Sequence, residues 1–156
     1  MNHGGRFATL LCMYSAHHVA WSHMEGEKRF GQAVSRRRRA SLARVLLRRC
    51  AECAQLLVHD KPAATRSGGG RVREIPLDAI TGTLEPGRAR EFDSEFRPTA
   101  RMKHRWLRVW VAEHTGPGLG PIEVVQFGNE YAIRDGHHRV SVARARGAAT
   151  IDAIVA

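Results

Sequence analysis

The chain has 156 residues, of which 43% are hydrophobic, and its 25 Lys and Arg against 15 Asp and Glu give a formal net charge of +10. This length suits one domain with an appendage, and three cysteines are too few for a secreted disulfide scaffold. No apolar run approaches the roughly 20 residues that cross a bilayer, so we expect no membrane insertion. The excess of arginine favours DNA or RNA as a partner, although a genome that favours arginine codons explains it nearly as well.

The first 27 residues show no clear periodicity, and we predict a poorly ordered leader over 1–27. The stretch "FATLLCMYSA" (7–16) has the apolar character of a signal-peptide core. His17, His18 and a strongly basic continuation follow it, which fits a signal peptide poorly. We therefore expect a cytoplasmic protein.

Residues 28–58 are predicted to form one basic amphipathic helix, because apolar side chains recur at spacings near three and four. Its expected apolar face consists of Leu42, Val45, Leu46, Cys53, Leu56 and Leu57. Four consecutive arginines, Arg36, Arg37, Arg38 and Arg39, are candidates for contacts with successive phosphates of a nucleic acid. The alternative is that this run is simply a solvated face. Pro62 and three consecutive glycines then predict a linker over 59–70.

Residues 71–156 change to short mixed elements. We predict a strand and turn over 72–80, with Pro76 favouring a sheet edge, and a polar loop over 81–96. A helix over 99–115 carries an apolar stripe that includes Trp106, Leu107 and Trp110. The expected order continues with a hairpin (122–127 and 131–135), a helix (138–147) and a last strand (150–156). Together these elements predict a compact α+β domain.

The turn "DGHHR" at 135–139 is the main candidate site. Gly136 can bend the backbone sharply between strand and helix and allows a ligand to approach closely. The first amides of the following helix are unpaired and favour an anion. His137, His138 and Arg139 would be unfavourable cations in that first turn unless an anion offsets them. The alternative is that Asp135 caps the helix and the histidines are satisfied locally.

The segment 72–156 resembles the ParB/sulfiredoxin-like superfamily, in particular the N-terminal domain of ParB partition proteins. The resemblance rests on an ordered set of short motifs: "IPLDAI", a Pro-Ile-x-Val strand, a hairpin, the Gly-x-x-Arg turn, an alanine-rich helix and a closing strand. It implies a small ParB/sulfiredoxin-like α+β fold over 71–156. It also implies that the turn binds the phosphates of a nucleotide, through Gly136, His138 and Arg139.

The departures from the family pattern are specific. Sulfiredoxins carry a catalytic cysteine directly after the glycine, where this chain has His137, so sulfinic-acid reduction is not expected. CTP-binding ParB proteins have Gly-Glu-Arg-Arg at the turn, which leaves ATP or CTP, with Mg²⁺, open as the cofactor here. ParB-like free-serine kinases have a closer Asp-Gly-His turn, and that likeness implies catalytic roles for Asp135 and His137. A complete partition protein is not expected, because no helix-turn-helix segment appears before Ala156.

The loop before the helix at 99–115 supplies further candidates. In the superfamily this loop partly closes the nucleotide pocket. Arg90 is a candidate for a second phosphate contact, and Asp93 or Glu91 for binding Mg²⁺ through oxygen.

The preferred hypothesis is a ParB-like protein that binds a nucleotide or phosphate group and associates with DNA or another nucleic acid. One alternative is an Mg²⁺-dependent enzyme, either a small-substrate kinase or an NTPase or nuclease, that uses the Asp135–Arg139 turn. Another is a DNA-binding adaptor without a nucleotide. A homodimer is left open.

Overall fold

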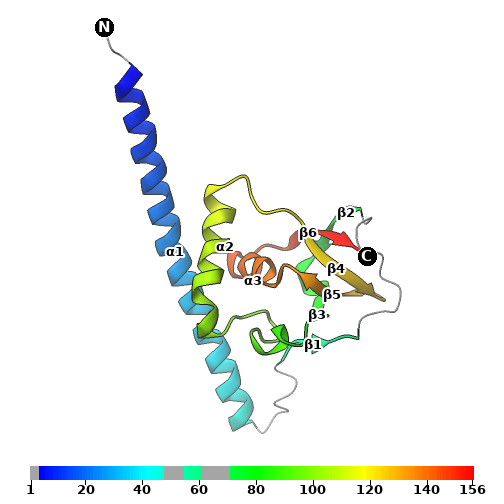
Figure 1. Cartoon of the computed structure of the whole chain (residues 1–156). Coiled ribbons are helices and arrows are strands. Elements are labelled where there is room, and N and C mark those ends of the chain that lie inside the picture. Colours follow the sequence, from blue (N-terminus) through cyan, green and yellow to red (C-terminus); the bar gives the residue numbers. More distant parts are fainter. Residues whose placement is uncertain (1–3, 48–54, 61–70) are drawn as a thin grey trace.

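The computed structural model of the protein describes the backbone of residues 4–47, 55–60 and 71–156, and the side chains from residue 17 onward. The protein is mixed α+β, as the sequence predicts. Within the described residues, three helices accompany a sheet of six strands. The long helix α1 (Gly4–Leu46) precedes the sheet and runs along one side of the molecule, with its N-terminal half extending beyond the other elements (Figure 1). None of the described helices combines the length and the apolar character that a bilayer crossing requires.

The α1 helix differs from the prediction at both ends. It begins at Gly4, within the expected leader, and ends at Leu46, well before residue 58. Leu57 and Val58 instead form strand β1 (Leu57–Val58), which pairs in parallel with β3 (Ile80–Thr83). Residues 48–54 and 61–70 lie outside the described part of the chain, so most of the predicted linker is not covered.

The predicted apolar face is wrong for its members within α1, whereas Leu56 is buried outside the helix and Cys53 lies outside the described residues. Leu42, Val45 and Leu46 are exposed, with relative accessibilities of 63%, 76% and 82%. The buried face of α1 is Phe30 and Val34, which pack in one cluster with Trp106, Leu107 and Trp110 of the second helix. Two large indole rings offer more apolar area than any other available partner, so they decide which side of α1 is buried.

The sheet has the order β1-β3-β5-β4-β6-β2. Strands β4 (Ile122–Phe127) and β5 (Glu130–Asp135) form the predicted antiparallel hairpin. β5 pairs in parallel with β3, and β4 in parallel with β6 (Thr150–Val155). Strand β2 (Val72–Pro76) pairs antiparallel with β6 at one edge of the sheet, which confirms the edge position expected from Pro76. Strand β3 was not predicted: Ile80 ends the predicted strand and turn over 72–80, and "TGT" (81–83) begins the predicted loop.

Two helices connect the sheet to α1. The predicted stripe of α2 (Lys103–Thr115) is largely confirmed, since Trp106, Leu107 and Trp110 are buried. Helix α3 (His137–Arg146) lies between α2 and the sheet (Figure 1). Its Val140 belongs to the main core cluster with sheet residues such as Ile122 and Ile133, and its Val142 belongs to the α1–α2 cluster. The α3 helix therefore couples the sheet to the long N-terminal helix.

Candidate functional site

The bend between β5 and α3 has the geometry that the sequence predicts. Gly136 adopts φ +111°, a left-handed conformation that side chains rarely tolerate. A Cβ atom at this position would lie 2.4 Å from Cγ2 of Ile122, so glycine is required for packing as well as for the turn. No side chain caps α3, and its first backbone bond runs from the amide of Val140 to the carbonyl of Gly136. The amides that precede Val140 are therefore available to an anion.

A cavity of about 140 Å³ opens at this helix start. The side chains that matter for its chemistry come from α2, α3, the end of β5 and the 3-10 turn η3 (Arg88–Arg90): they are Arg88, Arg105, Asp135, His137, His138 and Arg139. Three guanidinium groups against one carboxylate make the wall of this cavity basic. The cavity is small and suits a single phosphate group better than a whole nucleotide.

The two histidines are buried at the base of this cavity. Nε2 of His137 lies 2.7 Å from Oγ1 of Thr83, within hydrogen-bonding distance. His138 is only 6% exposed, and neither of its ring nitrogens has a hydrogen-bond partner within the described residues. Phe92 packs against both rings. Buried polar groups without a partner are costly, so the imidazole of His138 is a ready donor or acceptor for a bound group.

Burial lowers the pKa of both His137 and His138 from the ordinary value of 6.5 to about 4. The positive charges of Arg88 and Arg105 act in the same direction, whereas the carboxylate of Asp135 partly opposes them. Both rings are consequently neutral at pH 7. A neutral imidazole still offers one N–H donor, and a bound anion would favour the protonated form.

Arg139 lies beside the bend, but its guanidinium is already committed to the protein. Nη1 donates to the carbonyls of Gly120 and, at 2.8 Å, Pro121, and Nη2 pairs with Asp135 at 2.8 Å. These bonds fasten the loop after α2 to the start of α3. Arg139 therefore has a structural role in place of the predicted phosphate contact. Asp135 pairs with Arg139 and makes no capping hydrogen bond to α3, so the alternative prediction of a cap is wrong.

The unbalanced charge of the cavity comes from Arg105, which belongs to none of the motifs that predict the site. Arg88 pairs with Glu91 at 2.5 Å. Arg105 has no hydrogen-bond or ion-pair partner among residues 17–47, 55–60 and 71–156. Helical spacing on α2 gives no signal that separates Arg105 from the exposed Arg108, so only the packing of α2 beside the start of α3 identifies it.

The loop candidates for a second phosphate and for a metal have other roles. Asp93 is 3% exposed and accepts bonds from the amides of Glu95 and Arg97 and from the Arg97 side chain, so its oxygens are occupied in closing the loop. Glu91 pairs with Arg88, and no group of three or more potential metal ligands occurs among the described residues. Arg90 is exposed and does not line the cavity. The predicted Mg²⁺ site at Asp93 and Glu91 is therefore not supported by this geometry.

The four consecutive arginines of α1 have separate environments. Arg37 is half-buried and donates to the carbonyls of Glu91 and Arg97 at 2.9 and 2.8 Å, so it is a structural tie and not a free nucleic-acid contact. Arg38 and Arg39 are exposed. Arg36 lines a different cavity, between α1 and α3.

Neither protein-family models, nor curated proteins, nor solved structures give a significant match to this chain. The resemblance to the ParB/sulfiredoxin-like superfamily accordingly stays a prediction from short motifs. The site must be interpreted from its own chemistry.

Proposed function

We propose that this protein binds a phosphate group of a nucleotide at the start of α3. The observation that carries the proposal is the unpaired guanidinium of Arg105 over a cavity where uncapped helix amides and the unpartnered imidazole of His138 converge. Each of these groups donates or can donate a hydrogen bond, and together they match the acceptors of a phosphate. A nucleoside triphosphate such as ATP or CTP, with Mg²⁺ held mainly by the phosphates, fits this chemistry.

The volume of the cavity limits how much of the nucleotide is enclosed. About 140 Å³ accommodates one phosphate, so the base and ribose would lie outside, over the exposed surface near Leu119. Affinity would then come chiefly from charged hydrogen bonds, and discrimination between bases would be weak. This is our reason for expecting similar binding of ATP and CTP.

Titration calorimetry of the full chain with ATP, CTP and ADP, with and without Mg²⁺, tests the proposal. We expect Arg105→Ala to weaken binding by about tenfold or more, because a charged hydrogen bond contributes roughly 1.5–3 kcal/mol. Arg108→Ala removes the same charge from an exposed position on α2 that does not line the cavity, and should change affinity less than about twofold. No binding by any of the three nucleotides, or equal losses in the two variants, would overturn the proposal.

The association with nucleic acid is the second part of the proposal. It is supported by the net charge of +10 and by the exposed Arg38 and Arg39 on α1. Such contacts would be to phosphates and would not depend on base sequence. Because Arg38 and Arg39 are remote from the α3 cavity in sequence and on a different helix, the two activities are separable by mutation.

A further inference from the structure

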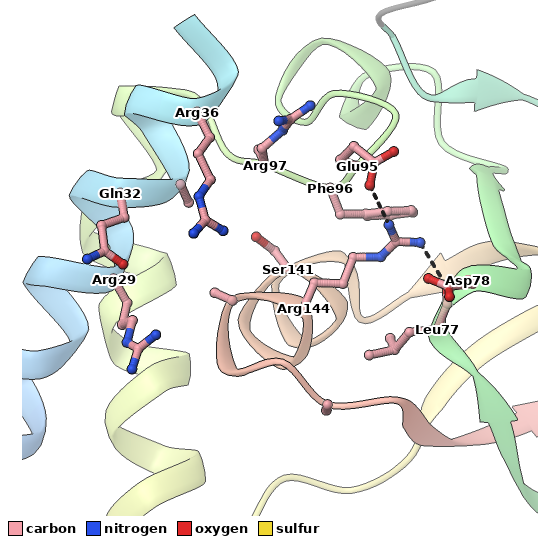
Figure 2. A pocket seen from close by; sticks show the side chains of 13 residues that line it. Arg29, Gln32, Arg36, Leu77, Asp78, Glu95, Phe96, Arg97, Ser141 and Arg144 are labelled. Atoms are coloured by element: carbon pink, nitrogen blue, oxygen red, sulfur yellow. Dashed lines mark hydrogen bonds and ion pairs between the residues drawn. The ribbon is translucent and has the colours of Figure 1, made fainter. Parts of the chain in front are cut away.

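A second and larger cavity, of about 310 Å³, lies between α1 and the sheet-bearing part of the chain. Figure 2 shows Arg29, Gln32 and Arg36 extending from α1, with Ser141 and Arg144 of α3 across from them. This cavity adjoins the C-terminal half of α3, whereas the cavity described above adjoins its first turn. The two sites share no lining residue.

The end of this cavity at α1 is basic. Residues 29, 32 and 36 follow a spacing of three and four, which places their side chains on one face of the helix. Arg29 pairs with Glu25 at 2.7 Å but remains 45% exposed at its side chain. Arg36 has neither an ion pair nor a hydrogen bond with any residue that the structure describes, although it faces α3. Its charge is therefore available to a ligand.

The other end of the cavity is mixed in charge. Arg144 pairs with Glu95 at 3.2 Å, donates to the carbonyl of Leu77 at 2.7 Å, and lies 5.3 Å from the ring centroid of Phe96. Asp78 lies beside this guanidinium, farther from α1, with its carboxylate exposed (Figure 2). Glu95 and Asp78 can both accept hydrogen bonds, so this end suits hydroxyl or amino groups and not a second anion.

We infer that this cavity binds a small phosphate ester bearing hydroxyl or amino groups, such as a nucleoside monophosphate. The phosphate would lie against Arg29 and Arg36, where planar guanidinium groups can bind two oxygens each. The hydroxyl or amino groups would lie toward Asp78 and Glu95. A volume near 310 Å³ is at the lower end of the range for small-molecule sites, about 300–1,000 Å³, which favours a monophosphate over a larger dinucleotide.

The position of this cavity gives the ligand a structural consequence. Because its walls come from α1 on one side and from α3 on the other, a bound ester bridges the long helix to the rest of the fold. A ligand that binds the folded chain but not the unfolded chain raises the free energy of unfolding by mass action. Ligand in excess over its Kd should thus raise the melting temperature, and at equal free concentration a tighter ligand should raise it more.

Titration calorimetry of the full chain with AMP and CMP tests the inference. We expect Arg36→Ala to weaken binding at least tenfold, with an unchanged melting temperature in the absence of ligand, because Arg36 makes no bond to the described residues that its removal would break. The matched control is Arg39→Ala, which removes the same charge from an exposed position on the same helix outside the cavity. That variant should bind within about twofold of the parent. Equal losses in both variants would show only general attraction to a basic helix and would overturn the inference.

Two further measurements separate this site from the one at the start of α3. Arg105→Ala should leave AMP binding intact; if AMP binding is lost in Arg105→Ala and retained in Arg36→Ala, the ligand belongs to the α3 start and this inference is wrong. Inorganic phosphate should bind at least tenfold more weakly than AMP, and Asp78→Asn should reduce that difference. Phosphate binding as tight as AMP binding would overturn the assignment of an ester, as would the absence of any binding by AMP and CMP.

Discussion

At the scale of single residues, His137 and His138 carry the least expected property of this protein. The sequence suggests two cations at the start of a helix, but burial under Phe92 keeps both imidazoles neutral at pH 7, with a pKa of about 4. The positive end of the α3 dipole favours the same neutral state. The charged groups around them are Arg88 and Arg105, which disfavour protonation, and Asp135 and Glu91, which favour it.

The neutral histidines predict acid sensitivity of the fold. Between pH 6.5 and 4 the unfolded chain binds protons that the folded chain excludes, so the free energy of unfolding falls as pH is lowered through this window. We expect a loss on the order of a few kcal/mol, because each pKa unit corresponds to about 1.4 kcal/mol. Urea unfolding at several pH values measures it.

Substitution of one histidine by phenylalanine, whose ring does not titrate, isolates the contribution of that histidine to the pH-dependent loss of stability. His138→Phe should remove about half of the pH-dependent loss, whereas His104→Phe, at an exposed position of α2, should leave it unchanged. An unchanged pH slope in His138→Phe would contradict the neutral, buried state of that imidazole.

At the scale of elements, Arg37 joins α1 to the loop at 90–97 by hydrogen bonds. The guanidinium of Arg37 donates to the carbonyls of Glu91 and Arg97 at 2.9 and 2.8 Å, and to that of Arg90 at 3.3 Å. The planar fork of arginine can reach several carbonyls at once, which a lysine ammonium cannot reproduce with the same geometry. Arg37 is thus a clamp between the helix and the loop.

Removal of this clamp should destabilise the fold more than removal of the neighbouring Arg38, although the two changes remove the same charge. We expect Arg37→Ala to lower the free energy of unfolding by about 1–3 kcal/mol, since hydrogen bonds from a charged donor are lost. Arg38→Ala, which removes an exposed arginine, should change it by less than about 0.5 kcal/mol. Denaturant unfolding of both variants decides the matter, and equal stabilities would contradict the assigned role.

At the scale of the whole molecule, the net charge of +10 predicts an electrostatic interaction with nucleic acid. Each phosphate contact contributes a slope of about −0.9 to the dependence of log affinity on log salt for duplex DNA. Neutralising Arg38 and Arg39 together should therefore reduce the magnitude of this slope by up to about 1.8. Fluorescence anisotropy with a labelled duplex at a series of salt concentrations provides the measurement.

The control for this prediction uses two exposed arginines at the β2 edge of the sheet. Arg71→Ala with Arg73→Ala removes the same charge from exposed positions at and beside β2. A smaller change in slope for this pair would support α1 as the nucleic-acid surface. Equal changes would assign the interaction to overall charge.

Local sequence signals determined much of this architecture. The hairpin, the edge strand with Pro76, the helix with its two tryptophans and the glycine bend before α3 all follow from alternation, helical spacing and backbone preference within a few residues. These features depend on near neighbours in the chain, which is why the α+β class and the place of the bend could be predicted.

Only the tertiary structure decided which of several similar residues does what. Arg36 to Arg39 look alike in sequence, yet Arg37 is a half-buried clamp, and of the three exposed arginines only Arg36 lines the cavity between α1 and α3. Leu42 and Leu46 suit an apolar face, but Phe30 and Val34 are the residues that meet the indole rings of α2. Arg105 became part of the site only because α2 places it over the start of α3. Each of these outcomes depends on contacts between segments tens of residues apart, and such contacts are set by packing and not by local spacing.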